Sequence, residues 1–217
     1  NITVSDKITY VFTNKAEFHR NSFLNSSTVT IYAQLLNYSG KILALNEAEI
    51  VAERFNFPEG MVLSNGTLSV GNMNTASMHI NGTLCSHGQA NILSNGSITI
   101  SKGGALMGDL IIVEGKDVNQ KGKVHSSTRF EVNAPEYSLA ADKVQTHEFR
   151  INSNNVNLKA PMREVSKLLS INASKIICET WVELNTATVE LINVSYISYN
   201  SIVANNVLVD FLGDFTN

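Results

Sequence analysis

The sequence predicts an all-β protein folded as a single-domain parallel β-helix. The first observation is a short phrase that recurs in residues 63–70, 80–84 and 93–100, where an Asn-Gly step is followed by alternating apolar and Ser or Thr residues. Asn and Gly tolerate the positive φ of tight turns, and the alternation marks a strand with one buried face. Because a strand-and-turn unit is reused, we expect coils stacked on one another, an architecture that supplies shape rather than chemistry.

The second observation is that β-favouring runs continue after the glycines disappear. Twelve of the thirteen Gly lie between Gly40 and Gly122, and residues 123–212 use Asn at turns instead. We therefore expect one domain over residues 1–217, in which turn chemistry changes and strand chemistry does not. The predicted strands of the second half are 129–132, 148–151, 156–158, 175–178, 181–184, 189–192, 194–197 and 206–209.

The third observation is the spacing of the turns. A β-sandwich also shows short strands every ~8–12 residues, so strand spacing alone leaves both architectures open. The recurring phrase restarts after 16 and 14 residues, inside rung-like units, which favours a coil of short parallel strands. At roughly 20 residues per coil and ~4.8 Å between strands, about ten coils form a rod of roughly 50 Å. We expect inward columns of aliphatic residues, and ladders of turn Asn bonded to the backbone above and below.

Three segments depart from the repeat. Residues 1–30 are expected to be an N-terminal cap or the first coils, and residues 210–217 the C-terminal end, because a stacked coil exposes apolar residues wherever its ends are uncovered. Residues 161–169 begin with Pro161 at a favourable first helical position and place Met162, Val165 and Leu169 at three- and four-residue steps. A short helix there competes with an irregular turn followed by a strand at 168–171.

Part of the chain resembles a known family. Residues 36–44, 48–55 and 63–70 look like the degenerate repeats of filamentous-haemagglutinin-type proteins: an aliphatic residue, Asn, Gly, an aliphatic residue, and Ala or Ser. The resemblance covers about residues 35–122. The family forms right-handed β-helices in large bacterial surface or secreted proteins, including adhesins and contact-dependent toxin carriers exported by two-partner secretion.

The resemblance implies a right-handed rod with a structural or adhesive role. It implies a secreted or surface-displayed bacterial protein, virulence-associated, that binds a protein or glycan on another cell surface. The Asn-rich secretion motifs of the family's export domain are not found in the sequence, so no export role is carried over. No functional residues come with the resemblance.

Charge and hydropathy argue against two classes of partner. The net charge is −3 with a pI near 6.0, and no run of Lys or Arg provides the footprint of a nucleic-acid-binding protein. The longest apolar stretches, such as 110–113 and 207–209, are far below the ~20 residues that span a bilayer. We therefore expect no nucleic acid partner and no membrane-spanning segment.

The sequence contains no standard enzyme motif: no Gly-x-Ser-x-Gly elbow, no Walker-type loop and no His-Glu-x-x-His. A β-helix that processes glycans needs carboxylates gathered on one outer face. Charged residues are densest at Asp109, Glu114, Lys116 and Asp117, and again at Glu47, Glu49, Glu53 and Arg54. Solvated corners explain both groups more simply than catalysis, so we expect no enzyme activity, no catalytic residues and no cofactor.

The two Cys and five His are too scattered to predict a metal site. Cys85, His87 and His79 give no Cys-x-x-Cys or paired-His spacing, so no metal is expected. Cys85 and Cys178 lie four to five coils apart, roughly 20 Å along the axis, whereas bridged Cα atoms lie within ~7 Å. Free thiols are expected. Trp181, the sole Trp, is expected to pack on a neighbouring coil rather than to bind a ligand.

The Asn-rich turns also create Asn-x-Ser/Thr sequons, which leave N-glycosylation open: Asn1, Asn25, Asn37, Asn65, Asn81, Asn95, Asn172 and Asn193. Three hypotheses of function follow from the whole sequence. The first is a structural or adhesive rod segment; the second is a glycan-binding or glycan-processing β-helix with its site on an outer face; the third is an intracellular effector or scaffold. An aligned column of carboxylates and aromatics would favour the second, and a bare face with Asn ladders the first.

Overall fold

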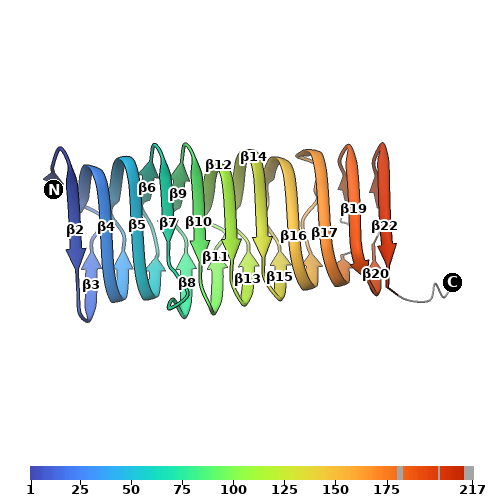
Figure 1. The fold of residues 1–217 in the computed structure, drawn as a ribbon, viewed down its shortest axis with the longest axis horizontal. Helices are drawn as coiled ribbons and strands as arrows, with labels where there is room; N and C mark the ends of the chain where they lie inside the picture. Colours follow the sequence, from blue (N-terminus) through green and yellow to red (C-terminus); the bar gives the residue numbers. More distant parts are fainter. Residues whose placement is uncertain (180–182, 200, 213–217) are drawn as a thin grey trace.

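The computed structural model describes residues 1–179, 183–199 and 201–212. Their strands coil into a parallel solenoid of about ten turns, with β1 at one end of the rod and β22 at the other (Figure 1). Within the described residues there is no helix. The prediction of an all-β parallel β-helix is therefore confirmed.

The coils contribute their strand segments to three faces, which we call A, B and C. Face A contains β1 (Ile2–Thr3), β6 (Met61–Ser64), β9 (Thr83–Ser86), β18 (Glu183–Asn185) and β21 (Ser201–Val203). Face B contains β2 (Lys7–Val11), β7 (Thr67–Val70), β10 (Gln89–Leu93), β19 (Thr188–Val194) and β22 (Asn206–Phe211). Face C contains β3 (Lys15–Phe18), β8 (Ser77–Ile80), β11 (Ser97–Ile100), β13 (Asp117–Gln120), β15 (Glu136–Leu139) and β20 (Tyr196–Ser198).

Six longer strands turn corners without interruption and so belong to more than one face. They are β4 (Phe23–Tyr38), β5 (Lys41–Phe57), β12 (Ala105–Glu114), β14 (Lys123–Asn133), β16 (Val144–Leu158) and β17 (Val165–Cys178). At four of their corners the pairing register shifts, which marks a local bulge. Several short strands predicted from the sequence are therefore parts of longer ones, such as 148–151 and 156–158 within β16.

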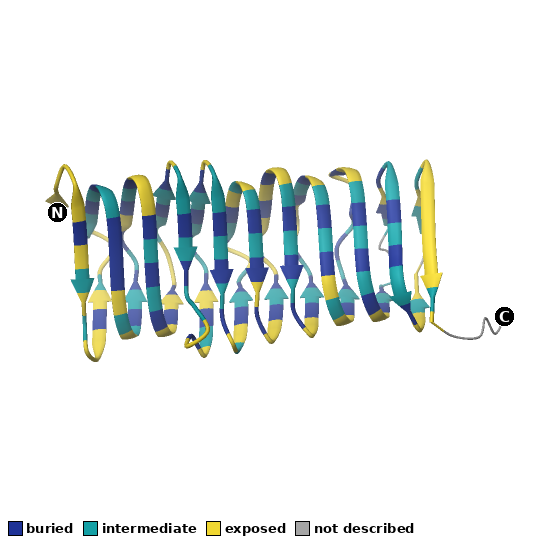
Figure 2. Cartoon of the chain, viewed as in Figure 1, coloured by how far each residue is buried: buried dark blue, intermediate teal, exposed yellow. Residues whose placement is uncertain are grey.

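The core is a set of inward columns that run the length of the rod. On face B one column is aliphatic from the second coil onward: Ile31, Ile50, Val70, Ile92, Val113, Val132, Ile151, Ile171, Leu191 and Val209. Alternating residues along each strand point inward, which produces the alternating bands of burial in Figure 2. The predicted inward stacking of aliphatic residues is confirmed.

The recurring phrase does not mark one full coil. Lys41 pairs with Met61 and Met61 pairs with Thr83, so the two coils that contain these steps take 20 and 22 residues. The three Asn-Gly steps lie at three different corners: between β6 and β7, between β8 and β9, and between β10 and β11. The intervals of 16 and 14 residues are therefore distances between corners of different kinds.

The helix considered for residues 161–169 is wrong. The chain turns a corner after Pro161 and enters β17 at Val165, so the competing interpretation of a turn followed by a strand is correct. Met162, Val165 and Leu169 are all buried, but on different segments of one coil. Their helix-like spacing arises because the backbone bends around the core between them.

The two described ends of the rod differ in side-chain character. β1, β2 and β3 form the first coil, where Tyr10, Phe12 and Phe18 pack together with ring centroids 5.7–5.9 Å apart. In β22, Val207 and Val209 continue inward columns but remain 51% and 40% exposed, and this strand is coloured exposed along most of its length in Figure 2. Trp181 and part of the strand predicted at 181–184 lie outside the described residues.

Candidate functional site

Face C carries two columns of outward side chains along nearly the whole rod. The first column is Lys15, Leu35, Arg54, Ser77, Ser97, Asp117, Glu136, Asn155, Lys175 and Tyr196. The second column is Glu17, Asn37, Asn56, His79, Thr99, Asn119, Ser138, Asn157, Ile177 and Ser198. Because adjacent parallel strands lie ~4.8 Å apart, successive members of a column are within reach of one another.

Two open troughs of about 440 Å³ each lie along these columns. The N-terminal trough is lined by side chains that include Lys15, Asn37, Arg54, Asn56, His79 and Thr99. The C-terminal trough is lined by side chains that include Asp117, Glu136, Ser138, Asn155, Asn157 and Lys175. Face C is therefore hollowed twice, and amides, hydroxyls and charges line both hollows.

The C-terminal trough places two carboxylates side by side. Asp117 and Glu136 are in register in adjacent strands, and Asn155 Nδ2 donates a hydrogen bond to Glu136 Oε1 at 2.6 Å. Within the described residues neither carboxylate forms an ion pair. Like charges directly opposite each other on a sheet are destabilising. Stability of the rod therefore does not explain this pair.

Asparagine acceptors without donors lie in and beside the same trough. Among the described residues, the buried Oδ1 atoms of Asn157, which lines the trough, and of Asn119 have no hydrogen-bond partner, and Ser138 lies between these two residues in the column. Most buried polar atoms in proteins are paired, so these two acceptors are exceptions. At the end of the trough, Lys175 Nζ lies 5.7 Å from the ring centroid of the exposed Tyr196.

The N-terminal trough is richer in donors and cations. Asn56 Nδ2 donates to Asn37 Oδ1 at 2.9 Å, and the His79 ring contacts Ser101 Oγ at 3.2 Å. Lys15 pairs with Glu17, and its hydrogen bond and positive charge lower the pKa of the Glu17 carboxyl. The two troughs thus differ in charge: Lys15 and Arg54 line the first, whereas two carboxylates and one cation, Lys175, line the second.

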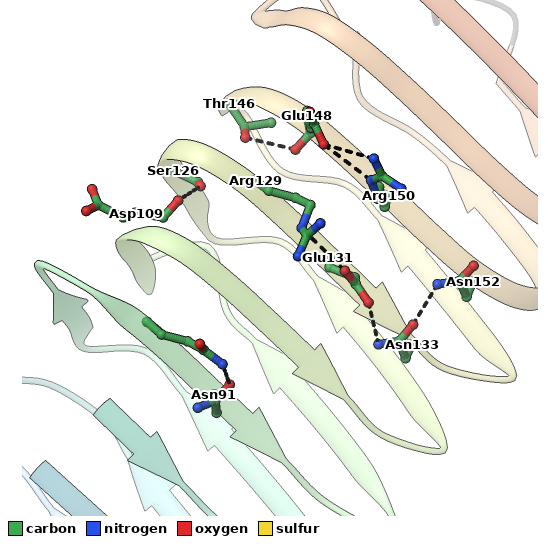
Figure 3. Close-up of polar contacts among 11 residues, drawn as sticks. Asn91, Asp109, Ser126, Arg129, Glu131, Asn133, Thr146, Glu148, Arg150 and Asn152 are labelled. Atoms are coloured by element: carbon green, nitrogen blue, oxygen red, sulfur yellow. Dashed lines mark hydrogen bonds and ion pairs between the residues drawn. The ribbon is translucent and has the colours of Figure 1, made fainter. Parts of the chain in front are cut away.

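On face B, unlike the C-terminal trough of face C, charged side chains are paired with opposite charges, as Figure 3 shows. Arg129 pairs with Glu131 at 3.5 Å, and Arg150 pairs with Glu148 at 3.1 Å. In the sheet Arg129 is in register with Glu148 and Glu131 with Arg150, so every charge has opposite charges as neighbours. The like-charged pair on face C has no such compensation.

Asn side chains form pairs between coils, as the composition suggested, but their partners differ from the prediction. Asn152 Nδ2 donates to Asn133 Oδ1, and Asn193 Nδ2 donates to Asn172 Oδ1, both at 2.8 Å. These bonds join side chain to side chain, whereas the prediction was bonding to the backbone. Backbone bonding does occur at Asn81, whose Nδ2 donates to Pro58 O at 2.9 Å.

The charged patch singled out in the sequence is divided by the fold. Asp109 lies at the corner between faces A and B, where its carbonyl accepts a hydrogen bond from Ser126 Oγ at 2.7 Å. Glu114 ends the face B segment of β12, and Asp117 begins β13 on face C. The neighbour that Asp117 does acquire is Glu136, which the sequence analysis missed. The only signal for it was the coil period of roughly 20 residues.

The second charged group is also divided. Glu47 and Glu49 point outward on face B, while Arg54 lies on face C. Tyr32 donates its hydroxyl to Glu49 Oε2 at 2.7 Å, and this hydrogen bond to a carboxylate raises the pKa of the phenol. Glu53 accepts from Gln34 Nε2 at 3.3 Å. These are hydrogen bonds between exposed side chains, as expected of a solvated surface.

Cysteine and histidine side chains are dispersed over different faces. Cys85 points outward from face A, His79 lies on face C, and His87 lies at the corner after β9. In the described part of the chain no three His, Cys, Asp or Glu residues are grouped so as to hold a metal ion. Cys85 and Cys178 are both free thiols, as predicted. Burial raises the pKa of Cys85, and it raises the pKa of Cys178 to about 11.

Comparison with known proteins gives no relative. No family model, curated protein or solved structure matches the chain. The likeness to filamentous-haemagglutinin-type repeats therefore remains a likeness of sequence pattern. The described residues include no helix of the length and apolarity needed to cross a membrane.

Proposed function

We propose that this chain is a rigid, adhesive rod segment of a secreted or surface-displayed bacterial protein. The observation that carries the proposal is the continuity of the inward columns, which make one uninterrupted core from coil to coil. Such a core holds the outer faces in fixed register, so contacts made on one coil recur along the rod. The repeat pattern shared with filamentous-haemagglutinin-type proteins supports the cellular setting, and the partner is a protein or glycan on another cell surface.

Adhesion by the isolated rod tests this proposal. Beads coated with the folded chain should adhere to bacterial or animal cells more strongly than beads coated with the heat-unfolded chain, because unfolding destroys the register of the outer columns. Retention is measured under flow. Equal retention of both bead types on all cells tried would contradict an adhesive role.

Glycan binding by face C is the second candidate, and the C-terminal trough is the specific observation that favours it. The carboxylates of Asp117 and Glu136, which form no ion pair with any described residue, and the polar side chains of Ser138, Asn155 and Asn157 complement the hydroxyl groups of a sugar chain. A chain of sugar rings lying along the rod axis would meet one pair of outward side chains per coil. Exposed aromatic platforms are scarce in this trough, so hydrogen bonding would dominate recognition.

A polysaccharide panel with matched variants tests the second candidate. We expect the wild type to be retarded in gels containing a hydroxyl-rich polysaccharide, and Asp117→Asn or Asn157→Ala to lose at least half of that retardation. Glu190→Gln removes one carboxylate from an outward position of face B and should leave it unchanged. Equal loss in all three variants, or no retardation of the wild type, would exclude face C as the site. Release of reducing ends would indicate glycan processing instead of binding.

A further inference from the structure

The three Asn-Gly steps share one dipeptide but have different surroundings. Asn65-Gly66, Asn81-Gly82 and Asn95-Gly96 each lie at a corner of the coil, where the Gly leaves the backbone unshielded by a side chain. This arrangement is the one in which an Asn side chain can react with its own backbone. The relevant chemistry is spontaneous deamidation, which needs only water.

The reaction has two requirements that a folded chain can enforce. The backbone nitrogen of the following Gly attacks Asn Cγ, a C–N bond forms, and the side-chain nitrogen leaves as ammonia to give a succinimide. Water then opens the ring to Asp or isoaspartate, so the balance is Asn plus water giving the acid plus ammonia. The Asn side chain must be free to move, and the Gly N–H must not be held in a hydrogen bond.

Asn81 meets neither requirement. Its Nδ2 donates to Pro58 O at 2.9 Å, and Gly82 N donates to Phe57 O at 3.1 Å. The Phe57 ring also lies against Gly82. Both the electrophilic carbon and the nucleophilic nitrogen are therefore held in place.

Asn95 meets one requirement. Its side chain is exposed, but Gly96 N donates to Ser94 Oγ at 3.0 Å. The same contact occurs at the corner between β9 and β10, where Gly88 N donates to Ser86 Oγ at 3.2 Å. At Gly88 and Gly96, therefore, the Ser two residues earlier accepts a hydrogen bond from the Gly nitrogen.

Asn65 meets both requirements. Its side chain is exposed, and among the described residues neither it nor Gly66 N has a hydrogen-bond partner. The equivalent serine, Ser64, donates its hydroxyl toward Asn46 O at 3.1 Å and Thr67 O at 2.8 Å. In the described part of the chain it accepts no hydrogen bond from Gly66 N. The Gly66 nitrogen is left available.

We propose that Asn65 is the rod's site of spontaneous deamidation, ahead of Asn95, with Asn81 protected. The product places a new carboxylate at the corner between faces A and B, close to Asn46 of the preceding coil. In the isoaspartate form the backbone gains one atom at a corner where Gly88 N donates to Gly66 O at 3.1 Å. The modification therefore acts on the stacking of coils as well as on charge, and it does not depend on the proposed function.

Ageing the folded chain at mildly alkaline pH tests the ranking. Peptide mapping by mass spectrometry should show conversion at Asn65 several-fold faster than at Asn95, and little at Asn81. The same incubation in denaturant should bring the three rates together, because all three dipeptides are identical in sequence. Equal rates in the folded chain, or Asn81 reacting first, would overturn the proposal.

A single substitution tests the cause. Ser94→Ala removes the hydroxyl oxygen that accepts a hydrogen bond from Gly96 N. The carbonyl of Thr75 loses its hydrogen bond from Ser94 Oγ but keeps the one from Asn95 N at 3.0 Å, so the corner should remain folded. Conversion at Asn95 should rise toward that at Asn65, and Asn65 itself should not change. An unchanged Asn95 rate in a folded variant would show that the free Gly nitrogen is not the controlling feature.

Discussion

At the residue scale, ionisable groups on inward columns keep their neutral forms. Burial raises the pKa of Tyr38 and Tyr137 as well as that of the Cys178 thiol. Desolvation penalises the charged form of each group, so the folded rod binds protons that the unfolded chain releases. The interior of this rod is thus a source of sensitivity to high pH rather than to low pH.

Cys178 gives this sensitivity a defined pH window. Its pKa rises from 9.0 to about 11, so its contribution to stability is complete below pH 9 and is lost as the pH rises toward 11. We expect the free energy of unfolding of the wild type to fall more steeply in this window than that of Cys178→Ala. Denaturant titrations at several pH values measure the difference; Tyr38 and Tyr137 are present in both proteins and cancel. Parallel pH curves would contradict the assignment.

Phe149 is the residue whose truncation should cost most on face B. Its ring stacks on Phe130 at 4.8 Å between centroids and meets Tyr137 at 6.4 Å, and the side chain is fully buried. Phe149→Ala should lower the free energy of unfolding by about 3–5 kcal/mol. Phe149→Leu should cost less, and Ser170→Ala on the outer surface should cost almost nothing. A loss below 1 kcal/mol for Phe149→Ala, on the scale of a conservative core change, would show that this stack is not tightly packed.

At the element scale, the sequence predicted the positions of the strands well but not the corners at which one strand continues from one face to the next. Alternation of apolar and polar residues identified the strands of the second half because each strand has one inward face. It could not show that β16 and β17 continue around corners, since bulges let the chain bend without a turn residue. At residues 162–169 the same bending mimicked the spacing of a helix.

Corner glycines are expected to be essential where coils stack most closely. A Cβ on Gly66 would lie 2.2 Å from the carbonyl oxygen of Asn46, whereas one on Gly108 would lie 3.1 Å from that of Ser86. Gly66→Ala should therefore destabilise the rod by about 1–3 kcal/mol, and Gly108→Ala by clearly less. Thermal or denaturant unfolding of the two variants measures this. Equal effects would mean that the corners adjust freely.

At the scale of the whole molecule, the sequence predicted the architecture but not the surface. Coil length varies, as the pairs Met61–Thr83 and Ala105–Lys123 show, so a fixed period does not align outward residues. The neighbours Asp117 and Glu136 therefore became visible only with the strand register. The sequence pointed instead to Asp109, Glu114 and Asp117, which are close in the chain but separated by the corners.

The register of face C is the central claim, because the troughs and the proposed binding surface depend on it. Register neighbours in parallel strands have Cα atoms ~4.8 Å apart, within disulfide range, whereas residues two coils apart are separated by roughly twice that distance. The most direct measurement is disulfide formation in a chain from which Cys85 and Cys178 have been removed. Asp117→Cys with Glu136→Cys should form an intramolecular disulfide readily, and Asp117→Cys with Asn155→Cys should not. Rapid bridging of the second pair, or none in the first, would contradict the coil arrangement described here.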